Sequence, residues 1–187
     1  MIDLNIVVED RLDAKLLRKY LPKIEGLTPR YYASAGKVSL ATMARNLLVH
    51  EEGSVLVVMD TDSLNPQMAQ QERLLTLATL RLVADVTRFD AFAFCPEHEV
   101  IFFETPDILE RYWPGAEALS KASLERVGYA PKRELAKLLE AANLTAEQWF
   151  ASLTAEDGEI LRRSGQASHL VGLFEKLAAE SHELALS

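Results

Sequence analysis

The chain has 187 residues, of which 49% are hydrophobic, and its formal net charge is −8 at pH 7. This length is typical of one domain, or of one domain with a helical extension, and the apolar content suffices for a core. A module that holds nucleic acid by charge alone is usually basic, so the acidic balance counts against that class. The single cysteine, Cys95, excludes an internal disulfide and is typical of a reducing compartment. The chain opens without a basic segment leading into an apolar one, and charges interrupt every long apolar run, so we expect a cytoplasmic protein without membrane contact.

Short apolar runs alternate with helical patterns in the first part of the chain. Predicted strands cover residues 4–8, 31–33, 55–59 and 92–94. Runs of this length that are rich in β-branched residues are typical of buried parallel strands. Between them, apolar residues recur at helical spacing in three segments; these are Leu12, Leu16, Leu17 and Tyr20, then Leu40, Met43, Ala44, Leu47 and Leu48, then Leu74, Leu75, Ala78 and Leu82.

The later part of the chain reads differently. Residues 100–103 are apolar, and their pattern fits either a fifth strand or a buried helix. Beyond Pro106, helices are predicted at 106–113, 116–127, 131–142, 145–152, 155–164 and 167–183. Thr145 with Gln148 and Thr154 with Asp157 have the spacing of helix-start capping boxes.

Alternation of strands and helices predicts an α/β fold, with a mainly parallel Rossmann-type sheet flanked by helices on both faces. We expect this α/β domain to span 1–105. An α-helical C-terminal region, 106–187, is expected to pack on it.

Two acidic clusters follow predicted strands. Glu9 and Asp10 come directly after the first strand, and Asp60 and Asp62 come after the third. Ligands of open α/β sheets sit beyond the carboxyl ends of the strands, so Glu9, Asp60 and Asp62 converge if these strands are neighbours. Crowded carboxylates need a cation or protons to neutralise them, and oxygen ligands favour Mg²⁺ or Mn²⁺.

Each acid also has a simpler interpretation. Asp10 and Asp13 stand where acidic residues cap a helix and favour its dipole. In an extended segment Asp60 and Asp62 would face the same way and could bind one ion; the alternative is a turn with Asx-type hydrogen bonds before Asn65-Pro66.

Four further residues are candidates for the same site. Glu97 and Glu99 follow the fourth strand and could add a metal ligand or a general base, although a solvated turn after Pro96 is an equal alternative. We interpret His98, between them, as a surface histidine. Lys37 follows Gly36, which permits close backbone approach, and could pair with a substrate phosphate. Lys132 could do the same, or could lie on a solvated helix face.

The Glu9-Asp10-x-x-Asp13 segment, the βαβ pattern and Asp60-x-Asp62 together resemble the Toprim domain, the catalytic module of topoisomerases, bacterial primases and overcoming-lysogenization-defect nucleases. The family pattern has a Glu, usually followed by Gly, after strand one and D-x-D after strand three; Asp10 replaces that Gly here. The chain is most similar to small stand-alone Toprim-like proteins, which carry an E-x-E-x-W-like segment where residues 97–101 stand, with Ile101 in place of the aromatic. The resemblance covers about residues 1–110.

A second resemblance is to the receiver domain of response regulators. There, an acidic pair after strand one and Asp60 would hold Mg²⁺, and Asp60 would accept a phosphoryl group. Receivers also carry a Ser or Thr after strand four and a Lys-Pro after strand five. Cys95-Pro96-Glu97 stands at the first of these places, and Pro131-Lys132 has the wrong order and lies too far along the chain.

The Toprim resemblance implies Mg²⁺-dependent phosphodiester chemistry on nucleic acid. Glu9 would act as general acid or base or as a metal ligand, Asp60 and Asp62 would hold Mg²⁺ or Mn²⁺, and Glu97 or Glu99 would assist. Any ATPase partner would be a separate chain, because the sequence has no Walker-type loop. The alternatives are a receiver-type module phosphorylated on Asp60 and a non-catalytic protein that binds a partner chain.

Overall fold

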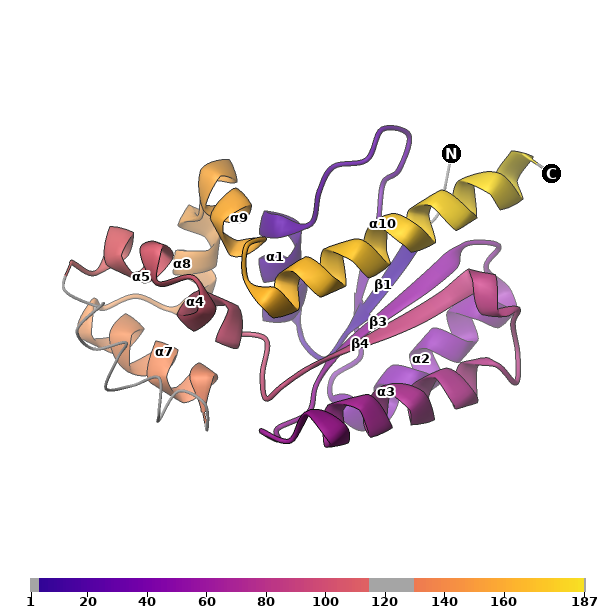
Figure 1. Cartoon of the computed structure of the whole chain (residues 1–187), viewed down its shortest axis with the longest axis horizontal. Helices are drawn as coiled ribbons and strands as arrows, with labels where there is room; N and C mark the ends of the chain where they lie inside the picture. Colours follow the sequence, from indigo (N-terminus) through magenta and orange to yellow (C-terminus); the bar gives the residue numbers. More distant parts are fainter. Residues whose placement is uncertain (1–3, 115–129, 187) are drawn as a thin grey trace.

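A computed structural model of the chain describes residues 4–114 and 130–186. It has an α/β fold in which a parallel four-stranded sheet is flanked by helices (Figure 1). The strands are β1 (Leu4–Val8), β2 (Arg30–Ala33), β3 (Ser54–Asp60) and β4 (Phe89–Phe94). Their order in the sheet is β2-β1-β3-β4, and all three neighbouring pairs are parallel. The predicted fold class is therefore confirmed.

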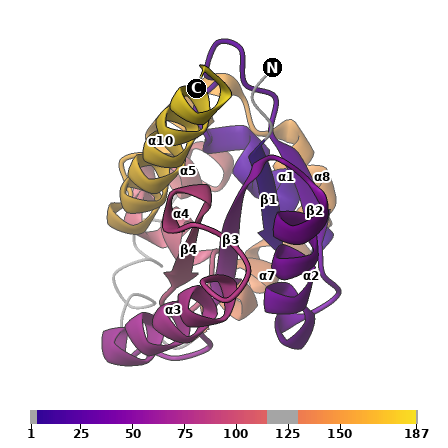
Figure 2. The same cartoon turned by 90° about the vertical axis from the view of Figure 1, so that its right-hand side faces the viewer.

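Helices cover both faces of the sheet (Figure 2). They are α1 (Arg11–Tyr20), α2 (Lys37–His50), α3 (Pro66–Leu80) and α10 (Gly165–Leu186). Side chains alternate between the faces along each strand. On β3, Leu56 and Val58 belong to the core beneath α1 and α10, whereas Val55 and Val57 belong to the core beneath α2 and α3. A short 3₁₀ turn, η1 (Val86–Arg88), leads into β4.

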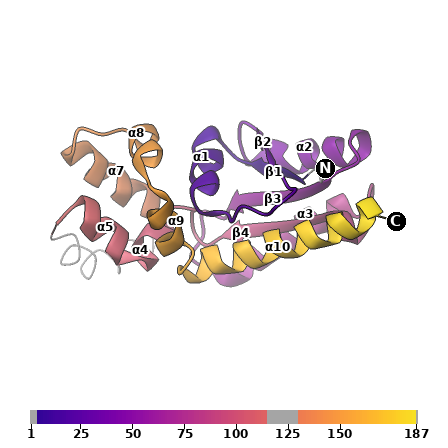
Figure 3. The ribbon, with the colours of Figure 1, turned by 90° about the horizontal axis from the view of Figure 1, so that it is seen from above.

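Short helices gather beyond the carboxyl ends of the strands (Figure 3). They are α4 (Val100–Glu104), α5 (Pro106–Tyr112), α7 (Pro131–Ala141), α8 (Ala146–Ser152) and α9 (Ala155–Leu161). Residues 100–103, which fitted a strand or a helix, thus belong to a buried helix. The capping boxes at Thr145 and Thr154 are confirmed. The predicted helix at 116–127 lies outside the described residues.

One apolar core joins the helical region to the sheet. Trp149, Leu161 and Phe174 from the C-terminal helices share a buried cluster with Ile6 of β1. Helices α8 and α9 contact α1, and α10 contacts β3 and β4. None of the helices in the described ranges combines the length and the apolar character needed to cross a membrane.

The predicted buried face of α3 is wrong. The residues expected in the core, Leu74, Leu75, Ala78 and Leu82, are exposed, and Ala69, Leu77 and Leu80 are buried instead. The helix has leucines on more than one side, so two apolar stripes satisfy helical spacing and periodicity could not choose between them.

Candidate functional site

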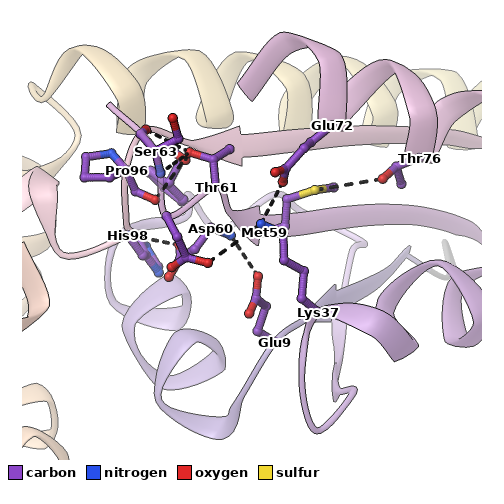
Figure 4. A network of polar contacts seen from close by, with 12 residues as sticks. Glu9, Lys37, Met59, Asp60, Thr61, Ser63, Glu72, Thr76, Pro96 and His98 are labelled. Carbon is purple, nitrogen blue, oxygen red and sulfur yellow. Dashed lines mark hydrogen bonds and ion pairs between the residues drawn. The ribbon is translucent and has the colours of Figure 1, made fainter. Parts of the chain in front are cut away.

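Glu9 and Asp60 meet where the chain direction switches within the sheet. From β1 the chain passes to β2 on one side, and β3 and β4 lie on the other side, so β1 and β3 flank the switch point. Ligands of open α/β sheets bind at such points, beyond the carboxyl ends of the strands. The backbone N–H of Asp60 donates to Glu9 Oε1 over 3.0 Å (Figure 4). The expectation that the two acidic clusters follow neighbouring strands is met.

Asp60 is a buried carboxyl group at the centre of other carboxyl groups. Its residue is 8% exposed, and Oδ1 accepts the backbone N–H of His98 over 2.9 Å. Burial, reinforced by the charges of Asp13, Glu99 and Glu9 and opposed by that of Lys132, raises the pKa of Asp60 to about 9. Asp60 is therefore neutral at pH 7 unless a cation approaches it.

Glu9 shares part of this environment. Burial raises the pKa of Glu9, while the Asp60 N–H and the ammonium of Lys37 oppose the rise, and Asp13 and Asp62 reinforce it. A glutamate whose pKa is moved toward neutrality is suited to exchange protons with a reacting group.

Asp62 does not share a face with Asp60. Strand β3 ends at Asp60, and Asp62 has a φ of 54°, so the backbone is no longer extended there. Its side chain is 70% exposed, and Oδ2 lies 3.8 Å from Lys37 Nζ. Asp62 stands at the rim of the site, close enough to raise the pKa of Glu9.

The loop after β4 brings two acids to different places. Glu99 is 5% exposed, and burial raises its pKa against the opposing charge of Lys132. It belongs to the carboxyl cluster around Asp60. Glu97 instead accepts the backbone N–H of Lys132 over 2.9 Å, which satisfies a donor in the first turn of α7.

Lys37 and Lys132 flank the carboxyl cluster. Gly36 has a φ of 119°, a conformation that favours glycine, and turns the chain from β2 into α2 so that Lys37 opens the helix. Lys37 Nζ lies 2.8 Å from Glu72 Oε2 (Figure 4). Lys132 Nζ lies 3.8 Å from Asp10 Oδ2 and 3.9 Å from Glu99 Oε1. Burial alone would lower the pKa of Lys132, but the neighbouring carboxylates raise it, so this lysine is charged.

Asp13, Tyr20 and His98 also reach the site, and none was among the predicted site residues. Asp10 and Asp13 form the capping box of α1, as the simpler interpretation of these acids held. Asp13 Oδ1 also lies 3.5 Å from His98 Nδ1; burial alone would raise the pKa of Asp13, but His98 lowers it. His98 is 1% exposed, so its assignment as a surface histidine was wrong. A usable signal was the spacing of Asp13 and Tyr20, which lie two turns apart on one face of α1.

The carboxyl groups of Glu9 and Asp60 are suitable ligands for a hard cation, although they do not supply a complete coordination shell. Within residues 4–114 and 130–186, no three His, Cys, Asp or Glu residues form a group that could hold a metal ion. Mg²⁺ in phosphate-handling sites is usually held by one or two carboxylates, and water and substrate phosphates complete its shell. Glu9 and Asp60, whose carboxyl groups interact electrostatically, are the two carboxylates that could meet this smaller requirement.

Comparisons with protein-family models, with curated proteins and with solved structures gave no match. The function is therefore inferred from the geometry of this chain's own residues.

Proposed function

We propose that this protein carries out Mg²⁺- or Mn²⁺-dependent phosphodiester chemistry on nucleic acid, in the manner of a Toprim-like nuclease. The observation that supports this most is the contact of Glu9 with Asp60 at the β1/β3 switch point. Glu9 accepts the backbone N–H of Asp60, the charge of Glu9 helps to raise the pKa of the Asp60 carboxyl group to about 9, and the pKa of Glu9 is raised as well. A bound cation would relieve the repulsion between the negative charges of such a pair.

In this proposal Asp60 and Glu9 hold the ion, with Glu99 behind them and Asp62 at the rim. When bound, the ion stabilises the negative charge that develops on the phosphate during the reaction. Glu9 is the residue suited to move a proton, because its pKa is raised and its side chain is only half-buried.

Lys37 and Lys132 would contact the phosphates that do not react. They approach the carboxyl cluster from α2 and α7 respectively, so a phosphodiester chain crossing the cluster meets a cation on each side. Localised cations of this kind allow an acidic protein to bind nucleic acid at one place, although the net charge of −8 disfavours binding elsewhere on its surface.

The test is a cleavage assay on single- and double-stranded DNA and RNA with Mg²⁺ or Mn²⁺. Glu9→Gln should lower the rate by about 10²–10⁴-fold if Glu9 transfers protons, and it should also weaken metal binding, because Glu9 is one of the two proposed ligands. Asp60→Asn should abolish metal-dependent cleavage. Asp85→Asn, at the opposite end of the sheet, changes an exposed acid in the same way and should leave the rate unchanged. Equal rates in all four proteins would refute the proposal.

The receiver-type module is the second candidate, because the order β2-β1-β3-β4 also occurs in the doubly wound class to which receivers belong. Two observations disfavour the receiver: the described residues lack the fifth strand of the order 2-1-3-4-5, since residues 100–104 form helix α4, and Asp60 is buried. A small phosphodonor with Mg²⁺ distinguishes the candidates. A phosphoryl adduct that disappears in Asp60→Asn but persists in Asp62→Asn would favour the receiver. Absence of both adduct and cleavage would favour a non-catalytic protein with a partner chain.

A further inference from the structure

His98 is buried between the β4–α4 loop and helix α1. Its ring stacks on Phe94, with centroids 4.3 Å apart and planes at 20°, and its Nε2 lies 2.7 Å from the hydroxyl of Tyr20. Its Nδ1 faces Asp13 Oδ1. A carboxylate favours a proton on the nitrogen that faces it, and in the tautomer with the hydrogen on Nδ1 the Nε2 accepts the Tyr20 O–H. The contact with the Tyr20 hydroxyl thus holds one ring nitrogen on α1, and the Asp13 carboxylate lies 3.5 Å from the other.

The backbone of His98 forms a hydrogen bond with the side chain of Asp60. The N–H of His98 donates to Asp60 Oδ1 over 2.9 Å. The start of the loop is held separately, because the side chain of Gln166 pairs with both the N–H and the carbonyl of Cys95. The middle of the loop is held by the Pro96 carbonyl, which accepts the backbone N–H groups of Thr61 and Asp62. The His98 side chain adds the contact that ties residue 98 to α1, so movement of the imidazole would move the donor relative to Asp60.

We infer that His98 is a positioning residue, whose imidazole, anchored on Tyr20 and Asp13 of α1, fixes its own backbone N–H against the carboxyl group of Asp60. Its importance for turnover rests on the proposed function of Asp60. The hydrogen bond itself can be measured without any activity.

The test removes one hydroxyl group from each of two buried contacts. Tyr20→Phe keeps the ring against His98 and deletes the hydroxyl. Ser181→Ala is the matched control, since Ser181 Oγ bonds the hydroxyl of Ser54 over 2.6 Å at the first residue of β3, the opposite end from Asp60. Amide hydrogen exchange of His98 is followed by NMR in both variants and in the parent protein.

Tyr20→Phe should speed exchange of the His98 amide about fivefold to tenfold, which corresponds to the loss of one buried hydrogen bond, and Ser181→Ala should leave it unchanged. In the cleavage assay kcat should fall in Tyr20→Phe with KM unchanged. Unchanged exchange in Tyr20→Phe, or an equal rise in both variants, would overturn the positioning role. Faster exchange confined to Tyr20→Phe, in a protein that cleaves nothing, would support the positioning role and refute the proposed function.

Discussion

Replacing Asp60 by Asn should stabilise this protein near neutral pH, although most substitutions of buried residues destabilise. The Asn side chain has nearly the same shape, and its amide oxygen can accept the His98 N–H that Asp60 Oδ1 accepts. What the substitution removes is the cost of placing a charge in a buried position that is already surrounded by acids.

The magnitude follows from the pKa. The carboxyl of Asp60 has a pKa of about 9 in the folded protein, against an ordinary value of 3.8. The folded protein therefore keeps a proton that the unfolded chain releases. The stability due to protonated Asp60 is fully present below pH 4 and is lost as the pH rises toward 9, at about 1.4 kcal/mol per pH unit. Between pH 5 and pH 8 the free energy of unfolding should fall by about 4 kcal/mol from this group.

Urea unfolding followed by circular dichroism at several pH values between 5 and 8, in the presence of a chelator, measures this change. The parent protein should lose stability steeply over this range, and Asp60→Asn should lose much less, because only the smaller contributions of Glu9 and Glu99 remain in that direction. Asp85→Asn should follow the parent protein. Parallel pH profiles for the parent and Asp60→Asn, or a less stable Asp60→Asn at pH 8, would refute the reasoning.

Three further outcomes are expected. Mn²⁺ at a hundredfold excess over its Kd should add about 2.7 kcal/mol to the stability of the parent protein and raise its Tm, but not that of Asp60→Asn; an unmoved parent would count against a metal here. Gly158→Ala should lower stability by about 1–3 kcal/mol, because a Cβ there would overlap the Lys19 carbonyl, whereas Gly172→Ala meets open space and should not; equal effects would contradict this. Asn5→Val should raise the Tm, since the buried Asn5 amide has no hydrogen-bond partner among the described residues, and a lower Tm would reveal one.

Much of the sheet could be predicted because buried strands leave a local signature. The runs at 4–8 and 55–59 are uninterrupted and apolar, and both became central strands. The fourth strand was predicted at 92–94, yet it begins at Phe89. The first half of the strand was missed because it contains Asp90, and an acid rarely lies within a strand. In the structure, the guanidinium of Arg73 on α3 forms an ion pair with Asp90 over 2.7 Å. That pairing comes from tertiary structure, which no local pattern reveals.

For the candidate site too, some residues could be placed from the sequence and others could not. Glu9 and Asp60 could be brought together from sequence because neighbouring parallel strands end at the same edge. The position of Asp62 could not, because the extended backbone stops at Asp60 and the residue takes a left-handed conformation. His98 lies in a loop, where buried residues do not recur at regular spacing as they do in helices and strands. Because its two neighbours in sequence are acidic, it was predicted to lie on the surface. Its burial is decided by Phe94 and α1.

The distribution of cations around the carboxyl cluster indicates where a metal would matter most. Asp13 faces His98, Asp62 faces Lys37, and Glu99 faces Lys132. Asp60 takes part in none of the ion pairs formed within the described ranges, and the hydrogen bond that its carboxyl group accepts there comes from the backbone N–H of His98. Its pKa is accordingly moved from 3.8 to about 9. A divalent ion that binds at the switch point therefore competes there with a proton, so its affinity should rise with pH up to about 9. A cluster in which every carboxylate, including Asp60, was paired with a lysine would show no such dependence of metal affinity on pH.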